Sequence, residues 1–323
     1  MTTDLTAPAE PAASSQRLTV EHETLYRYAR AVDMAQHIAC LRPLSDEGQV
    51  LEQFEMSVSP LPAQHSTRRD AFGNSRAYFA LNAAHKELQV VARSQVQVKA
   101  RYHGLDPALG ATCGEVRELL TYRAEAPFQS ASEFAYASPY VPMHDELRDY
   151  GAQSLKDDRP LAEAVIELMN RIHTDFTYAP ASTDISTPIL AVFNQRKGVC
   201  QDFAHLMLGC LRACGLAGRY VSGYLLTVPP EGQVPLVGAD ASHAWVSVWC
   251  PGLGLPAGGW LDLDPTNDCV PDTHHVRVAH GRDFGDVTPL RGVIRGGGKH
   301  TLLVRVTTRL VKDGVKKLTQ APQ

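Results

Sequence analysis

The chain has 323 residues, which at about 150 residues per domain predicts two domains. Its 31 Lys and Arg residues nearly balance its 35 Asp and Glu residues, for a formal charge of −4, so it lacks the basic excess of a nucleic-acid-binding protein. The apolar fraction of 44% is too high for wholesale disorder, and no apolar run approaches the roughly 18 residues of a membrane span. We therefore expect a globular protein whose partner is neither nucleic acid nor a membrane.

The cysteines and the first residues of the chain indicate a compartment. The seven cysteines form no CxxC pair, and an odd number is not typical of a disulfide scaffold. Residues 1–16 are small and polar, without the positive segment and apolar core of a secretory signal. We expect a disordered tail over residues 1–16, reduced cysteines and a cytoplasmic location.

The part of the chain that follows the tail has the two-residue period of β-strands. Strands are predicted over residues 18–28, 50–58, 76–81 and 88–98. Residues 70–74, with the sequence DAFGN, have the composition of a turn. Short strands separated by turns predict a sandwich-like antiparallel β domain over residues 17–105.

The rest of the chain, residues 106–323, mixes helices with strands. Apolar residues recur at helical spacing over 161–172 and again over 203–214, where Gly215 follows as a helix stop. Further strands are predicted over residues 218–228, 241–250, 259–264 and 302–310. The Gly-rich residues 292–298 are interpreted as a flexible turn before the last strand, which can pair with either domain. The predicted fold class is α+β.

Cys200 is the first residue with a chemical signature. It follows Gly198 and Val199 and opens the second predicted helix. The partial positive charge and unpaired N–H groups of a helix N-terminus favour a thiolate, and the same N–H groups can bind an oxyanion. Many cysteines at such positions only pack, so the position alone does not establish a nucleophile.

His243 and Asp264 lie on consecutive predicted strands. The residues between the strands are rich in Gly and Pro, which predicts an antiparallel hairpin. The register that opposes His243 and Asp264 also opposes Trp249 and Gly258, and it leaves residues 250–257 as the loop. Directly opposed residues have Cβ atoms about 5 Å apart, so the carboxylate can bind one imidazole nitrogen and orient the other toward a thiolate. This geometry allows a Cys–His–Asp triad.

The segments around these residues resemble the core motifs of the transglutaminase-like superfamily, whose members have a papain-like cysteine-enzyme core. The segments are GVCQDFA at 198–204, SHAWV at 242–246 and GWLDLDPT at 259–266. They occur in the order and spacing of that family. Residues 20–28 and 70–74 look like signatures of the N-terminal domain of bacterial transglutaminase-like proteins, and residues 281–290 resemble their tail.

The resemblance implies a role for each residue of the triad. Cys200 matches the nucleophile, His243 the general base and acid, and Asp264, the Asp before Pro-Thr, the carboxylate that orients the histidine. Asp262 is then the near miss. The resemblance also implies an N-terminal antiparallel β domain followed by a papain-like core, in which the nucleophile helix packs on an antiparallel sheet.

A thioester intermediate follows from the implied triad. The thiolate is expected to attack an amide or isopeptide carbonyl of a peptide or protein substrate. Water as the second acceptor gives a cysteine protease or amidase, whereas an amine gives a transglutaminase. The triad does not encode this choice. Hydrolysis is favoured here because bacterial relatives in the superfamily are often regarded as proteases.

Two hypotheses without thioester chemistry remain open. A non-catalytic module could hold an extended peptide by strand pairing, with a vestigial triad. It predicts a buried Cys200 or a His243 that is turned away. A metal site built from Cys200, His243 and His274 predicts bound zinc. Neither a cofactor nor a metal is expected, and no dense acidic loop of the calcium-binding kind is present in the sequence.

Other residues near the motifs have structural interpretations. Tyr178 could donate to the oxyanion, although a core tyrosine is the simpler interpretation. Trp245 and Trp249 share a strand face with His243 and either wall the cleft or pack in the core. The remaining expectations are a first-turn helix acid at Asp202, a packed His205, core cysteines at 210 and 214, a solvated loop holding His274, His275 and His280, and a surface ion pair of Arg282 with Asp283.

Overall fold

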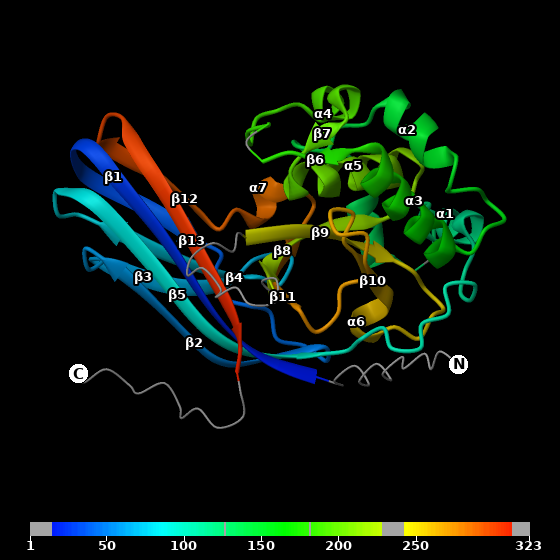
Figure 1. The fold of residues 1–323 in the computed structure, drawn as a ribbon, viewed down its shortest axis with the longest axis horizontal. Coiled ribbons are helices and arrows are strands. Elements are labelled where there is room, and N and C mark those ends of the chain that lie inside the picture. Colours follow the sequence, from blue (N-terminus) through cyan, green and yellow to red (C-terminus); the bar gives the residue numbers. More distant parts are fainter. Residues whose placement is uncertain (1–14, 126, 181, 228–241, 312–323) are drawn as a thin grey trace, which may run out of the picture.

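The computed structural model describes residues 15–311, except for 126, 181 and 228–241 (Figure 1). A seven-stranded antiparallel sheet lies at one end of the molecule, and a four-stranded sheet covered by helices lies at the other. The predicted tail lies outside the described residues up to residue 14. Ser15 and Gln16, which were expected to belong to it, are already part of the first strand.

The N-terminal sheet is built around one long strand. Its first five strands are β1 (Ser15–Ala39), β2 (Gln49–Ser59), β3 (Gln64–Arg69), β4 (Ser75–Leu81) and β5 (His85–Lys99), in the order β2-β5-β1-β4-β3. The first half of β1 pairs with β5 and its last residues pair with β4. β1 therefore joins two halves of the sheet, one with β5 and β2 and the other with β4 and β3.

Both halves contribute to one hydrophobic cluster. The cluster includes Phe79 and Leu81 of β4 together with Leu88 and Val90 of β5, all buried. Burial of these side chains stabilises one sheet that bends along β1, in preference to two separate sheets. One bent sheet thus supplies both sides of the predicted sandwich-like domain.

The end of the chain returns to this sheet. β12 (Leu290–Gly296) and β13 (His300–Leu310) both pair antiparallel with β1. The predicted domain boundary at residue 106 therefore places β12 and β13 in the core, although both strands form their hydrogen bonds in the N-terminal sheet. The flexible turn predicted over 292–298 is wrong for most of its length, because pairing with β1 holds these residues as a strand. The turn is confined to Gly296, Gly297 and Gly298, which have positive φ.

The core contains the second sheet and the helices. Its strands are β8 (Gly218–Leu225), β9 (Ser242–Trp249), β10 (Trp260–Leu263) and β11 (His275–Gly281), in the order β10-β9-β8-β11. The helical segments are α1 (Cys113–Leu120), η1 (Ser130–Ala135), α2 (Asp145–Ala152), α3 (Leu161–Asp175), α4 (Ile189–Gln195), α5 (Cys200–Ala213), α6 (Pro256–Gly259) and α7 (Phe284–Val287). A short parallel pair, β6 (Thr177–Tyr178) and β7 (Lys197–Gly198), precedes α5. Among the described residues no helix is long and apolar enough to cross a membrane.

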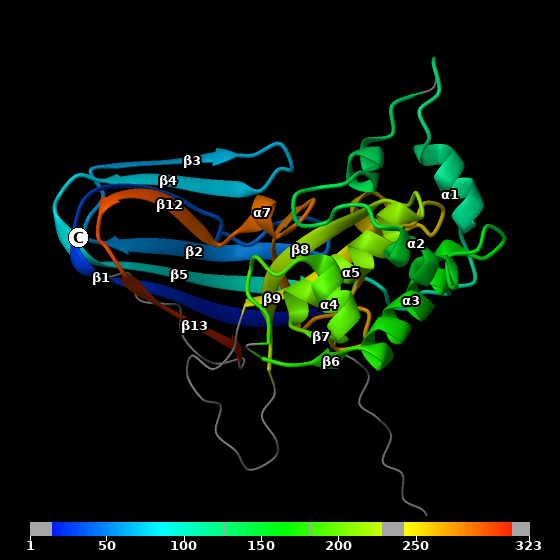
Figure 2. The same cartoon turned by 90° about the horizontal axis from the view of Figure 1, so that it is seen from above.

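The nucleophile helix lies on the second sheet. α5 packs against β8 and β9, and its apolar residues are buried there (Figure 2). The 3.6-residue period of Phe203, Leu206, Met207 and Cys210 produces this apolar stripe. The helix expected from the sequence is confirmed, and its packing places Cys200 beside the start of β9.

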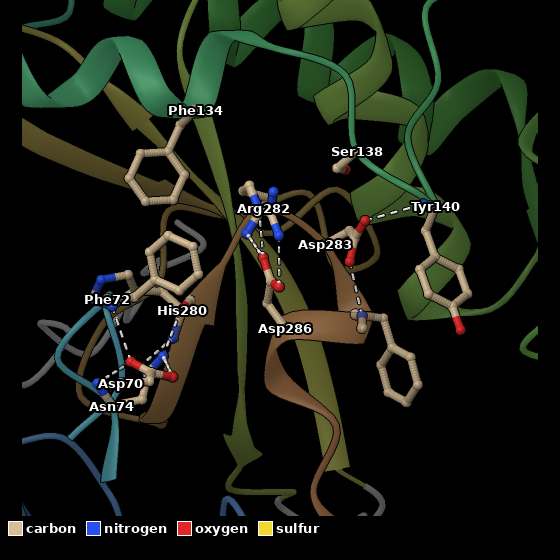
Figure 3. Close-up of polar contacts among 12 residues, drawn as sticks. Asp70, Phe72, Asn74, Phe134, Ser138, Tyr140, His280, Arg282, Asp283 and Asp286 are labelled. Atoms are coloured by element: carbon tan, nitrogen blue, oxygen red, sulfur yellow. Dashed lines mark hydrogen bonds and ion pairs between the residues drawn. The ribbon is translucent and has the colours of Figure 1, made fainter. Parts of the chain in front are cut away.

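The predicted turn at 70–74 joins the two sheets. Asp70 closes the turn by accepting the backbone N–H groups of Phe72 and Asn74. The Asn74 amide then forms two hydrogen bonds with the backbone of His280 in β11, one to its carbonyl at 2.8 Å and one from its N–H at 2.9 Å (Figure 3). The DAFGN segment thus docks the N-terminal sheet on the core.

Candidate active site

Asp202 fixes the position of Cys200 at the start of α5. The Asp202 carboxylate accepts hydrogen bonds from the N–H of Val199 at 2.8 Å and from the hydroxyl of Thr183 at 2.6 Å. A Cβ on Gly198 would lie 2.7 Å from this carboxylate, so only glycine lets it come so close. Asp202 is thus the first-turn acid that the sequence predicts, and Cys200 remains partly exposed.

His243 lies between Asp264 and Cys200. Its Nε2 is 2.7 Å from Oδ2 of Asp264, and Cys200 is its second side-chain partner. Because Nε2 faces the carboxylate, Nδ1 is the nitrogen left for the thiol. Burial opposes the imidazolium, but the hydrogen bonds with Asp264 and Cys200 outweigh it and raise the pKa of His243 to about 10.

The register of β9 and β10 differs from the predicted one. Trp249 lies opposite Trp260 rather than opposite Gly258. The predicted register is wrong by two residues because the connection includes α6 and is longer than expected. A shift of two keeps every side chain on its predicted face. Asp264 therefore reaches His243 from the turn after β10, not from the position directly opposite.

Asp264 is a buried carboxylate with many donors. It has no exposed surface, and its Oδ1 accepts the backbone N–H groups of Thr266 at 3.0 Å and Asn267 at 3.2 Å. Its Oδ2 accepts the Asn267 side-chain amide at 2.7 Å, besides His243 and His275. Burial by itself would raise the pKa of Asp264, but the hydrogen bonds from the two histidines hold it well below its usual range. The group stays ionised without contact with water.

The structure keeps Asp262 away from this group. Its carboxylate lies 2.5 Å from the Arg101 guanidinium, and its backbone N–H donates to the Tyr102 hydroxyl at 2.9 Å. Burial would raise the pKa of Asp262, but Arg101 and Arg277 hold it well below its usual range. Asp262 therefore belongs to a buried ion pair with Arg101 and not to the group around His243.

Tyr178 and Trp245 occupy different surroundings. Tyr178 pairs with Gly198 across β6 and β7 and is 51% exposed, so it is not a core tyrosine. Its partner Gly198 lies two residues before the nucleophile, and burial and the charge of Cys200 raise the pKa of Tyr178. Trp245 is fully buried, with its ring centroid 6.0 Å from that of His243. It backs the imidazole and does not line an open cleft.

Of the three histidines predicted to lie in a solvated loop, His274 lies in the turn before β11 and is partly exposed, but the other two do not lie in a loop. His275 begins β11 and is buried, and His280 lies in the same strand. The alternation of Val276 and Val278 with their neighbours is the period-two signal that could have indicated this strand. Burial lowers the pKa of His280 to about 3.

His275 joins the group around Asp264. Ligand atoms of His243, Asp264 and His275 all lie within 4.8 Å of one another, a set that could hold a metal ion. His274, which the zinc-site hypothesis included as a ligand, is not in the set. Because Oδ2 of Asp264 already accepts three N–H groups, we interpret the set as a hydrogen-bonded network.

The expected surface pair of Arg282 and Asp283 is wrong (Figure 3). Arg282 pairs with Asp286 one helical turn later, at 2.9 Å. Asp283 is buried and accepts the backbone N–H groups of Tyr140 at 3.0 Å and Gly285 at 2.9 Å. Its carboxylate caps α7 and holds the Tyr140 backbone, so it is engaged inside the protein and not in a surface ion pair.

His205 is packed on the buried side of the nucleophile helix α5, as predicted. Its ring lies 5.7 Å from that of Tyr140 and 5.1 Å from that of Tyr220. Its Nε2 accepts the N–H of Phe284 at 3.3 Å, and burial lowers its pKa to about 3. Cys210 is buried on the same helix, whereas Cys214 at the helix end is partly exposed.

Comparison with known proteins places the chain in a family. Residues 18–97 match the bacterial transglutaminase-like N-terminal region, and residues 148–265 match the transglutaminase-like superfamily. The uncharacterized protein Rv2569c of Mycobacterium tuberculosis is 40% identical over 91% of this chain and 92% of its own length. This chain belongs to the transglutaminase-like superfamily.

Two further likenesses extend over different shares of the chain. A protein-glutamine gamma-glutamyltransferase of Pseudomonas aeruginosa is 32% identical over 142 residues, which cover 41% of this chain and 20% of that enzyme. The crystal structure of a candidate cysteine protease from Cytophaga hutchinsonii superposes with a TM-score of 0.70 at 18% identity, covering 96% of this chain and 95% of the other. The second likeness confirms the predicted fold class.

Proposed function

We propose that this transglutaminase-like protein is a cysteine-nucleophile enzyme that opens amide or isopeptide bonds of a peptide or protein. The placement of His243 between Cys200 and the buried, ionised Asp264 carries the proposal. A non-catalytic binding module would predict a buried Cys200 or a His243 turned away. The partly exposed thiol and its contact with His243 favour the enzyme.

In the proposed first half-reaction Cys200 becomes acylated. The thiolate sulfur forms a bond to the carbonyl carbon while the C=O π electrons move onto oxygen. The oxyanion accepts the Cys200 N–H and the Tyr178 hydroxyl. The C–N bond then breaks, the oxyanion reforms the carbonyl, and His243 gives its proton to the leaving amine. Asp264 keeps the imidazole in the required orientation throughout.

In the second half-reaction an acceptor attacks the thioester. Water, losing a proton to His243, releases a carboxylic acid and restores Cys200, which makes the enzyme a cysteine protease or amidase. We favour this outcome. An amine acceptor instead gives a new amide, and the likeness to the Pseudomonas aeruginosa transferase supports that reaction as the second candidate.

The test offers both acceptors to the same acyl enzyme. The protein is incubated with a mixture of glutamine-containing peptides, with and without a primary amine, and the products are identified by mass spectrometry. Peptide cleavage or glutamine deamidation indicates hydrolysis, and a peptide–amine adduct indicates transfer. Cys200→Ala should abolish either product. Peptide binding without Cys200-dependent product would contradict the proposal and support the binding module.

A further inference from the structure

A second histidine contacts the same carboxylate oxygen as His243. The Nε2 of His275 lies 3.1 Å from Oδ2 of Asp264, the atom that also meets Nε2 of His243 at 2.7 Å. His275 is only 5% exposed and comes from β11, on the far side of the four-stranded sheet from β10. One oxygen of the proposed orienting carboxylate therefore lies between two imidazoles from different strands.

The surroundings of His275 assign its proton. Its Nδ1 is buried, and among the residues that the structure describes it has no hydrogen-bond partner. A proton on that nitrogen would be a buried donor without an acceptor, which is unfavourable. The neutral imidazole with its proton on Nε2 avoids this cost and donates to Asp264.

Packing holds the His275 ring in this orientation. The Trp245 ring lies 5.3 Å from it at an interplanar angle of 80°, an edge-to-face contact, while Trp245 also backs His243. The backbone N–H of His275 donates to the carbonyl of Asp272 at 3.0 Å, and the strand then pairs with β8. Side chain and backbone are both fixed, so the donor is preorganised.

We infer that His275 is a positioning residue that holds Oδ2 of Asp264 at the point where it meets His243. Asp264 lies beyond the end of β10, where its backbone bridges to Cys269 within the same turn, so the four-stranded sheet does not fix its side chain. The backbone N–H groups of the turn hold Oδ1. Oδ2 accepts the Asn267 amide from the same turn at 2.7 Å, and His275 adds a donor from across the sheet at 3.1 Å. This inference rests on the proposed function, because positioning matters only if His243 serves the Cys200 thiolate.

The experiment measures the alkylation rate of Cys200 by iodoacetamide at about pH 6, with mass spectrometry to locate the label, and the steady-state constants on any substrate found. His275→Leu removes the donor and should slow Cys200 alkylation and lower kcat by about ten-fold, with little change in KM. His275→Gln places an amide N–H near the lost Nε2–H and should restore most of both. Recovery by an amide donor is not expected from a role in packing alone.

Two further variants keep the test decisive. His275→Asn carries the same amide on a shorter side chain, which does not reach Asp264, and should behave like His275→Leu. If His275→Leu fails to fold, the two polar variants His275→Gln and His275→Asn can be compared instead. His37→Phe replaces another buried histidine whose ring nitrogens have no partner among the described residues, in β1 of the other sheet, and should leave alkylation unchanged.

The outcomes separate this inference from the proposed function. If wild-type Cys200 labels no faster at about pH 6 than in His243→Asn, the proposed function fails and the inference fails with it. If wild type shows the advantage and all His275 variants keep it, the inference alone is overturned. Equal losses in His275→Gln and His275→Leu would also overturn it, because a donor role requires rescue.

Discussion

At the scale of the residue, the site is a row of three side chains: Asp264 and His243 are buried, and Cys200 at the end of the row is partly exposed. Asp264 is fully buried and ionised, and His243 is nearly buried between this anion and the Cys200 thiol. A buried charge is tolerated only when it is paired and hydrogen-bonded, and Asp264 meets that condition with donors on both oxygens. The Asp264 anion in turn stabilises the protonated, imidazolium form of His243.

The raised pKa of His243 predicts how stability depends on pH. A histidine whose folded-state pKa lies near 10 and whose unfolded-state pKa is about 6.5 stabilises the fold fully below about pH 6.5. The contribution is lost as the pH rises toward 10. The difference in unfolding free energy between wild type and His243→Asn, measured by urea denaturation from pH 6 to 10, should therefore shrink with rising pH. A constant or growing difference would contradict the assigned proton.

At the scale of the element, the start of α5 combines the nucleophile with its own cap. Asp202 closes the first turn on the Val199 N–H, and Gly198 lets the carboxylate approach. The cap also draws in Thr183 from the loop before α4. The segment GVCQD is therefore one structural unit in which the neighbours of Cys200 hold the helix end that presents it.

Removal of the cap should weaken this helix end. Asp202→Ala leaves the Val199 N–H and the Thr183 hydroxyl without their acceptor, and we expect a loss of about 1–2 kcal/mol in the free energy of unfolding. Asp145→Ala is the matched control, because this first-turn acid of α2 is exposed and forms a surface pair with Arg148. It should change stability by less than about 0.5 kcal/mol. Equal effects of the two substitutions in urea denaturation would argue against a capping role.

At the scale of the whole molecule, the two sheets are joined by polar contacts on a hydrophobic junction. His22 of β1 contacts the Tyr224 hydroxyl of β8 at 3.0 Å, and Leu18 and Val306 of the first sheet share the core cluster of the second. Asn74 adds a side-chain amide that pairs with a strand backbone as another strand would. The N-terminal sheet thus packs on the strand that supplies His275.

Loss of the Asn74 amide should loosen this junction. Asn74→Ala leaves both the N–H and the carbonyl of His280 without their partner in a buried place, at an expected cost of about 1–3 kcal/mol. Gln95→Ala, which removes an exposed hydrogen bond to Glu52 in the same sheet, is the control and should have little effect. Thermal unfolding would show the contrast as a lower Tm for Asn74→Ala alone. Similar Tm values for both variants would contradict the docking role.

Much of the architecture follows from local pattern. The period of two over Leu18–Tyr28 and the apolar stripe from Phe203 to Cys210 predict elements that the structure confirms, because each period alone decides which side chains face a core. β3 was missed, since all six of its residues are exposed and carry no apolar alternation. The polar histidines at 274, 275 and 280 favour a loop after Asp272, although Val276 and Val278 carry the alternation of a strand.

The periodicity of the sequence by itself determined the nucleophile helix, and the resemblance of three motifs to a known family named His243 and Asp264 as the partners of Cys200, because both depend on short-range patterns. Only the tertiary structure decided the register of β9 with β10, the return of β12 and β13 to the first sheet, and the approach of His275 to Asp264. Each of these depends on pairing between distant segments, where the side-chain pattern is compatible with more than one partner. The free energy of packing in the folded molecule selects among them.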